Sequence, residues 1–530
     1  MKKFLAMLML AALLTTALAG FQTALAEGGT IVYSIQGDPE EMDPGLNSYA
    51  RSSLVLQNLF KGLYKFASDG KSYVPALAES CDVSEDGLTY TFHLREGLLW
   101  SDGTPLNAHD FEYSWKRVLN PEVASRAASD LWILKNGQAY NQGAAAQEDV
   151  GVKATDDLTL VCELETLAPW FVSMTATTAF MPVKKDIVEG SEAWTKTPDT
   201  YVSNGPFMLA EYSSLSHLTL VPNPNYYLAG EIQIDGVKIV IIPDKATELT
   251  AYNNGEINVS DELSPDALKQ YAGSDEFFTS GKIGIQYCDF NCSLPEFSDK
   301  RVRQAFAMAI DRQAVLNVLG LVEKPVYGFV PYSQPSLSTE GASYRDIAGD
   351  MFKEDPEAAK ALLAEAGYPN GENFPVVEIV TKNDNEQKLM AQVIGEMWKA
   401  NLGVEYSITT YESAVYWDEL AAGHFSTDRN GYTCDYVDPS ANLKIWVTGS
   451  NASENQWDDP VYDGMFAEAG KITDPAEREA KLIEIEKYLV DQMPGMPMYS
   501  YEDPYLIKPD IKGIVKNPIG HIYFEYAHFE

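Results

Sequence analysis

The chain has 530 residues, of which 77 are Asp or Glu and 39 are Lys or Arg, so its formal net charge is −38. This charge excludes a protein that binds nucleic acid through its phosphates, because such binding needs a basic surface. Hydrophobic residues make up 45% of the chain, which is enough for a large buried core and excludes intrinsic disorder.

The first 26 residues have the layout of a cleaved secretory signal. Lys2 and Lys3 precede the apolar run 4–14, and the small-residue triplet 24–26 follows it. We therefore predict that residues 1–26 are removed and that the protein is exported. A lipid-anchored protein would carry Cys where this chain has Phe21, so we expect no lipid anchor. We also expect no membrane helix, because the sequence has no later run of about 18 apolar residues.

Strands and helices alternate through the first part of the chain. Alternating apolar residues indicate strands, apolar residues three and four apart indicate helices, and Gly, Pro and Asp mark the turns between them. The predicted elements are a strand over 30–35, a helix over 53–63, a strand over 88–94, a turn over 100–105, a helix over 109–118 that begins near Asn107, and a hairpin over 152–164.

The second part of the chain has stronger helical signals. Helical spacing predicts a helix over 299–319 that ends at Gly320. Asp355 and Pro356 form the start of another helix, which Gly367 ends. The sequence has neither an internal repeat nor a low-complexity linker, so we expect lobes joined by short crossings in an α/β or α+β fold.

No catalytic motif stands out. The six His residues are scattered singly, and the sequence lacks the HExxH, GxSxG and paired CxxC patterns. A glycoside hydrolase would need two carboxylates, and no spacing among the 77 acids singles out such a pair. We therefore expect neither catalysis nor a metal or other cofactor.

The five Cys residues are too few for a disulfide scaffold. A metal site built on Cys288, Cys292 and Cys434 would have poor spacing. In an exported protein one disulfide is the better hypothesis, and its candidates are Cys81 with Cys162 or Cys288 with Cys434.

One long segment links the chain to a known family. Residues 100–125, WSDGTPLNAHDFEYSWKRVLNPEVAS, resemble the large solute-binding proteins that feed peptide ABC importers. The best match is the oligopeptide-binding branch of the family 5 bacterial solute-binding proteins. Other segments typical of the family occur in order along the chain: NLFKGLY (58–64), LAES (77–80), NGPF (204–207), NPNYY (223–227), GEIN (255–258), FSDKRVRQAFAMAIDR (297–312), DPEAAKALLAEAGY (355–368) and WKANLGV (398–404).

The resemblance implies a two-lobed periplasmic-binding-protein fold of the α/β class, type II-like, with a hinge between the lobes. The two crossings are expected near Ile283 and Ser500. The implied parts are a signal peptide over 1–26, a first lobe over 27–60, 192–283 and 502–530, an extra subdomain of that lobe over 61–191, and a second lobe over 284–501.

The resemblance also implies which residues hold a ligand. The segment 431–439, GYTCDYVDP, resembles the family segment in which an aspartate binds the α-ammonium group of a peptide, and that residue here is Asp435. Arg429 stands where the family carries an arginine able to meet a peptide carboxylate. The alternative for Arg429 is an ion pair between the lobes or with its neighbour Asp428.

Other positions depart from the family pattern or contribute through the backbone. Where the family can carry a second arginine and a histidine, this chain has Leu420 and Gln387, and the positions of the family's occasional disulfide hold Gly284 and Thr433. Cys288 with Cys434 is a possible substitute for that bridge. An extended ligand is expected to pair with exposed backbone at two segments: Asn47 to Ala50, and Gly431, Tyr432 and Thr433.

The function implied by the resemblance is that of a non-enzymatic, monomeric peptide-binding component of an ABC importer. Its partners would be a peptide, the permease and the ATPase subunits. Its location would be the periplasm, or the cell surface through contact with the transporter. Two alternatives remain open: the same fold binding a metal chelate, haem, a sugar or an opine, or a receptor that senses peptide without transporting it.

Overall fold

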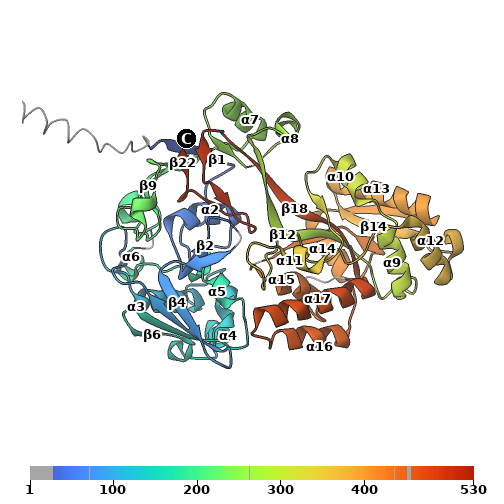
Figure 1. Ribbon diagram of the computed structural model, residues 1–530, viewed down its shortest axis with the longest axis horizontal. Helices are drawn as coiled ribbons and strands as arrows, with labels where there is room; N and C mark the ends of the chain where they lie inside the picture. Colours follow the sequence, from blue (N-terminus) through green and yellow to red (C-terminus); the bar gives the residue numbers. More distant parts are fainter. Residues whose placement is uncertain (1–27, 71, 192, 262, 435, 451–454) are drawn as a thin grey trace, which may run out of the picture.

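Two long antiparallel strands join the two lobes of the molecule (Figure 1). The computed structural model describes residues 28–530 apart from 71, 192, 262, 435 and 451–454, so the predicted signal peptide lies outside it. The joining strands are β12 (Phe277–Asp289) and β18 (Gly495–Ile507). Their pairing register shifts between Gly281 and Ile285. An irregularity in the pairing therefore divides each of the two strands into two halves.

A large mixed sheet extends from the first lobe through the crossing strands to β17, and β1 (Thr30–Ile35) in the first lobe is the predicted N-terminal strand. The strand order of the described sheet is β17-β12-β18-β11-β1-β10-β9-β8. β1 runs parallel to β10, and its residues Ile31, Tyr33 and Ile35 are buried. The other strands are β8 (Phe207–Ser213), β9 (His217–Pro222), β10 (Gly236–Ile241), β11 (Val259–Ser260) and β17 (Asn430–Thr433).

A separate antiparallel sheet follows the first part of this lobe, and a helix covers it. The helix, α3 (Ala108–Leu119), begins with a capping box in which Asn107 and Asp110 satisfy each other's backbone N–H groups. Its residues Phe111 and Trp115 are fully buried in the same core as β1, so this sheet and the first lobe share one core. The sheet has the order β4 (Ala78–Val83), β5 (Thr89–Leu94), β7 (Thr159–Glu163), β6 (Val152–Asp156).

The second lobe has its own core, which includes Trp398 and Trp446. Helices surround a parallel sheet of order β15-β14-β16, with β14 (Val377–Lys382) in the middle between β15 (Tyr406–Tyr411) and β16 (Thr427–Asp428). The main helices are α9 (Lys300–Met308), α10 (Arg312–Leu319), α12 (Pro356–Glu365), α13 (Asn385–Leu402), α14 (Ser413–Ala421), α16 (Pro460–Ala469) and α17 (Pro475–Gln492).

Two predicted helices have different limits in the structure. The helix predicted over 53–63 is α2 (Ala50–Leu59), which begins and ends earlier. The helix predicted over 299–319 is two helices, α9 and α10. Asp311 interrupts it because its side chain accepts a hydrogen bond from Ala314 N (2.8 Å) and so caps a new helix.

Neither predicted disulfide is possible in this fold. Cys81 on β4 pairs with Phe92 of β5, and Cys162 on β7 pairs with Tyr90, so two strand spacings and two residues along β5 separate them by about 12 Å. Ile283 on β12 is the partner of Cys434, and Cys288 lies five residues further along, about 16 Å away. A disulfide needs Cα atoms within about 7 Å, so both hypotheses were wrong.

The C-terminal segment is tied to the first lobe by a buried cluster of charges. Glu525 accepts ion pairs from Lys61 (3.2 Å) and Lys65 (2.8 Å), and all three side chains are buried. Tyr226 Oη donates a further hydrogen bond to Glu525 (3.2 Å). Burial raises the pKa of Glu525, but the two ammonium groups outweigh this effect and lower the pKa to about 2. The segment is therefore fixed by charge pairing as well as by apolar packing.

Candidate ligand cleft

β17 offers an outer strand edge beside the crossing strands, on which Gly431 N donates to the side-chain Oδ1 of Asn430 (2.8 Å). It is the last strand at one end of the large sheet and pairs with β12. Cys434 N donates to Ile283 O (2.9 Å), and antiparallel pairs alternate between bonded and non-bonded positions. The backbone groups of Tyr432 therefore face β12, whereas those of Gly431 and Thr433 face outward. Both Gly431 and Thr433 are exposed.

The edge at Gly431 is shaped by a tyrosine from the crossing strand β18. A Cβ at this position would overlap Tyr501 Oη, so the site has no room for a larger residue. Tyr501 Oη in turn donates to Gln286 Oε1 (3.1 Å). Burial raises the pKa of Tyr501 to about 12, so it remains a neutral donor. The glycine therefore lets β17 and Tyr501 approach each other.

Arg429 lies just before β17 and is already engaged by side chains of the second lobe. Its Nη2 donates to Glu386 Oε1 (3.0 Å) and to Tyr499 Oη (3.1 Å). Asp428, the partner in the alternative hypothesis, is fully buried and accepts from Asp289 N (2.7 Å). The ion pair that the structure gives Arg429 is thus with Glu386, not the predicted neighbour. The Arg429 side chain is 16% exposed and remains accessible at its edge.

Asp435 lies outside the described residues, but its chain neighbours meet the first lobe. Tyr436 stacks on Trp170, with ring centroids 5.1 Å apart and 12° between the planes. Tyr73 Oη donates to Val437 O (2.7 Å). Cys434 and Tyr436 are buried in a cluster that contains residues of both lobes. The segment around the predicted ammonium-binding residue therefore runs along the junction between the lobes.

The same junction contains a buried ion pair. Asp438 caps α15 (Pro439–Leu443) by accepting from Ser440 N (2.9 Å), and it pairs with Arg478 (2.6 Å). Both charged side chains are only 3% exposed. Both carboxylate oxygens of Asp438 thus stabilise this segment, so we do not assign Asp438 to ligand binding.

The segment Asn47 to Ala50 differs from the prediction. It is a short loop followed by the first residue of α2, not a strand edge. The Asn47 side chain is buried and donates to Ser53 Oγ (2.8 Å), while its Oδ1 accepts from Tyr49 N (2.9 Å). These bonds order the start of α2. Ala50 is exposed and lines a cavity with Lys282 of the crossing strand.

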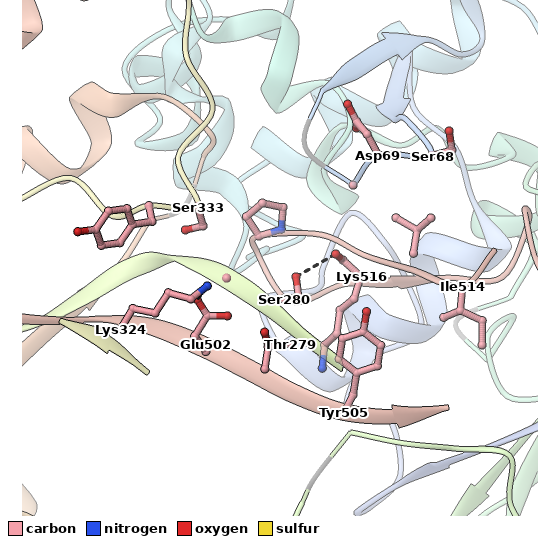
Figure 2. A pocket seen from close by; sticks show the side chains of 15 residues that line it. Ser68, Asp69, Thr279, Ser280, Lys324, Ser333, Glu502, Tyr505, Ile514 and Lys516 are labelled. Atoms are coloured by element: carbon pink, nitrogen blue, oxygen red, sulfur yellow. Dashed lines mark hydrogen bonds and ion pairs between the residues drawn. The ribbon is translucent and has the colours of Figure 1, made fainter. Parts of the chain in front are cut away.

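A second cavity lies beside the crossing strands, and both lobes line it (Figure 2). Ser280 Oγ donates to Lys516 O (3.0 Å). On the second-lobe side Lys324 pairs with Glu502 (2.7 Å). Lys516 pairs with Asp503 (2.8 Å). Burial lowers the pKa of Lys516, but the carboxylates of Asp261 and Asp503 outweigh this effect and hold the pKa above its usual value. These bonds tie the C-terminal segment to the hinge.

Two residues singled out by the resemblance do not supply a cation. Leu420 is fully buried in a small core with Tyr416. The Oε1 atom of Gln387 accepts from Thr381 Oγ1 (3.0 Å). The residues that sequence reasoning missed are Glu386, Tyr499 and Tyr501. Only the alternation of tyrosines at 499 and 501 in an apolar strand could have indicated two of them.

The described residues contain neither a metal site nor a membrane-spanning helix. Among them, no group of three or more His, Cys, Asp or Glu side chains is placed to hold a metal ion. No helix within the described ranges has both the length and the apolar character needed to cross a membrane.

Two lobes with separate cores, two crossing strands and a strand edge at their junction are the architecture of a two-lobed solute-binding protein. The chain belongs to the bacterial extracellular solute-binding proteins of family 5, whose model matches residues 72–454. It is 30% identical to the dipeptide-binding protein DppE of Bacillus subtilis over 95% of this chain and 93% of that protein.

Solved structures agree with this assignment. The unliganded open form of the murein tripeptide-binding protein MppA matches with a TM-score of 0.86 and 30% identity, covering 95% of this chain and 98% of that one. Another structure of MppA, from Escherichia coli, matches with a TM-score of 0.71 and 30% identity, covering 96% and 99%. The overall arrangement of this chain thus matches that of the unliganded open form. The predicted family and two-lobed fold are confirmed.

Proposed function

We propose that this protein binds short peptides between its two lobes outside the cytoplasm and delivers them to the permease and ATPase of an ABC transporter. The observation that carries this proposal is the outward-facing carbonyl of Gly431 and the outward-facing backbone of Thr433 beside the junction of the lobes. An extended peptide can pair with such an edge whatever its side chains are. Relatives along nearly the whole chain are named as peptide-binding proteins, which supports the same function.

Charged groups would fix the ends of the peptide. Asp435 would accept charge-assisted hydrogen bonds from the α-ammonium group, each worth about 1.5–3 kcal/mol. At the other end of β17, Arg429 would bind a carboxylate of a short peptide in place of Glu386. Tyr432 and Thr433 would line the path between them. No catalytic step and no cofactor enter this mechanism.

Binding would drive closure of the lobes, because a peptide held on one lobe gains contacts only when the other lobe closes on it. We propose the rigid parts as residues 27–60, 192–283 and 502–530 with the subdomain 61–191 on one side, and 284–501 on the other. The transporter would bind the closed form in preference to the open form. Export by a signal over 1–26, without a lipid anchor, would place a monomer in the periplasm or at the transporter.

The test is calorimetric titration of ligand-stripped protein with a pool of tri- to pentapeptides and with the same pool N-acetylated. We expect binding of the free pool only. Asp435→Asn should weaken it by about 10- to 150-fold, the loss of one charge-assisted bond. Asp458→Asn, at an exposed residue of the same lobe, is the matched control and should bind like the wild type.

Two results would contradict the proposal. Equal binding of the acetylated pool would remove the ammonium role from Asp435. Binding of neither pool would refute peptide as the ligand class and leave a metal chelate, haem, sugar or opine for the same fold.

A further inference from the structure

Lys382 lies at the edge of the second lobe where ligands of parallel sheets bind. It is the last residue of β14, the middle strand of the sheet β15-β14-β16. Val380 pairs with Asp428 on β16, so Arg429 and Lys382 both lie at the carboxyl ends of neighbouring strands. Ligands of open α/β sheets bind outside these carboxyl ends. A peptide that follows β17 from Thr433 toward Asn430 runs toward this edge.

The ammonium group of Lys382 lies over two aromatic rings, and no carboxylate among the described residues forms an ion pair with it. Its Nζ lies 4.4 Å from the ring centroid of Trp417 and 5.3 Å from that of Tyr416. Trp417 is 41% exposed, so the pair is open to solvent on one side. Among the residues that the structure describes, no carboxylate lies within ion-pair distance of Lys382. In a chain with net charge −38, this lysine is a partly buried cation to which the described structure gives no ion pair.

The surrounding charges leave this cation available. Burial lowers the pKa of Lys382, and nearby Arg429 lowers it further. The negative charge of Asp428 raises the pKa of Lys382. However, Asp428 is fully buried and accepts hydrogen bonds from Asp289 N (2.7 Å) and Tyr416 Oη (3.3 Å). A carboxylate that arrives from solvent would therefore relieve an unfavourable charge at Lys382.

Arg429 differs from Lys382 in this respect. Arg429 already donates to Glu386 and Tyr499, so a ligand carboxylate must displace Glu386 to bind there. At Lys382 a carboxylate has no described carboxylate to displace. The exposed face of Trp417 also offers an apolar contact beside the charge.

We propose that Lys382 is a second carboxylate-binding position, which holds the carboxyl terminus of peptides that extend past Arg429, with Trp417 against their last side chain. This inference rests on the proposed function, because it assumes that peptides lie along β17. According to this inference, Lys382 increases the affinity of the protein for longer peptides relative to shorter ones.

The test uses the mature protein, stripped of ligand, and alanine peptides of three to six residues as free acids and as C-terminal amides. For the wild type we expect amidation of the longer peptides to weaken binding by about tenfold or more, the loss of one charge-assisted contact. Lys382→Met should show this loss with the free acids and no further loss on amidation. It should bind the tripeptide acid within about twofold of the wild type.

Lys382→Arg keeps the charge and should retain the preference for the longer acids. Lys388→Met is the matched control, since Lys388 is a partly buried lysine of α13 that donates to Asn383 Oδ1 (3.2 Å). If Lys382→Met still loses affinity on amidation as the wild type does, the inference is overturned while peptide binding stands. If the wild type binds no alanine peptide of any length, both the inference and the proposed function fail.

Discussion

Replacing Glu525 with Gln is expected to lower the free energy of unfolding by about 3–5 kcal/mol. The substitution leaves Lys61 and Lys65, which are buried beneath the C-terminal segment, without their shared carboxylate. Removing one partner of a buried ion pair costs this much because the remaining charges stay out of water. Burial lowers the pKa of Lys61 to about 8 even with Glu525 present, which shows how little solvent reaches it.

The same cluster predicts how stability depends on pH. The pKa of Glu525 is about 2 in the folded chain, below its ordinary value of 4.5. Its stabilising contribution is therefore present above about pH 4.5 and is lost as the pH falls toward 2. Lys61 acts in another window. The unfolded chain binds more protons than the folded one between about pH 8 and 10.5, so stability should rise with pH there.

Urea-induced unfolding of the wild type and of Glu525→Gln, followed at several pH values, measures both effects. Glu530→Gln serves as the control, because Glu530 is exposed and lies 3.9 Å from Lys512. Its effect should stay within about 0.5 kcal/mol. A Glu525→Gln variant as stable as the wild type at pH 7 would show that the cluster contributes nothing net to folding.

Replacing Gly431 with Ala is expected to weaken peptide binding by about tenfold or more. The new methyl group overlaps Tyr501 Oη, so the ring must move and its hydrogen bond to Gln286 is broken. Overpacking of this kind costs about 1–3 kcal/mol. Because the overlap involves the edge strand itself, the shift should move the outward N–H and C=O groups that pair with the peptide.

The rescue is specific to one atom. Tyr501→Phe removes the overlapping oxygen, and the next nearest ring atom is 3.3 Å from the added Cβ. The double variant Gly431→Ala with Tyr501→Phe should thus bind more tightly than Gly431→Ala alone, as measured by calorimetry. Gly464→Ala, in open space on α16, should leave binding unchanged. Wild-type affinity in Gly431→Ala would mean that the ligand does not use this edge.

Local signals in the sequence determined many of the elements. The alternation of β1, the capping pair Asn107 and Asp110 of α3, and the start of α12 at Asp355 and Pro356 all depend on residues a few positions apart. Neighbouring residues fix such features before any packing occurs. The two lobes were indicated by the resemblance of segments along the chain to a known family.

Contacts between distant segments were decided only by the tertiary structure. The partner of Arg429 is Glu386, 43 residues earlier on α13, whereas the sequence offered a ligand carboxylate or the adjacent Asp428. The proposed cysteine pairs failed because strand register, which no short segment contains, sets them about 12 and 16 Å apart. Strand order also placed β17 at the edge of the large sheet. The sequence by itself thus determined the family and the local elements, whereas packing and register decided which groups face the cleft.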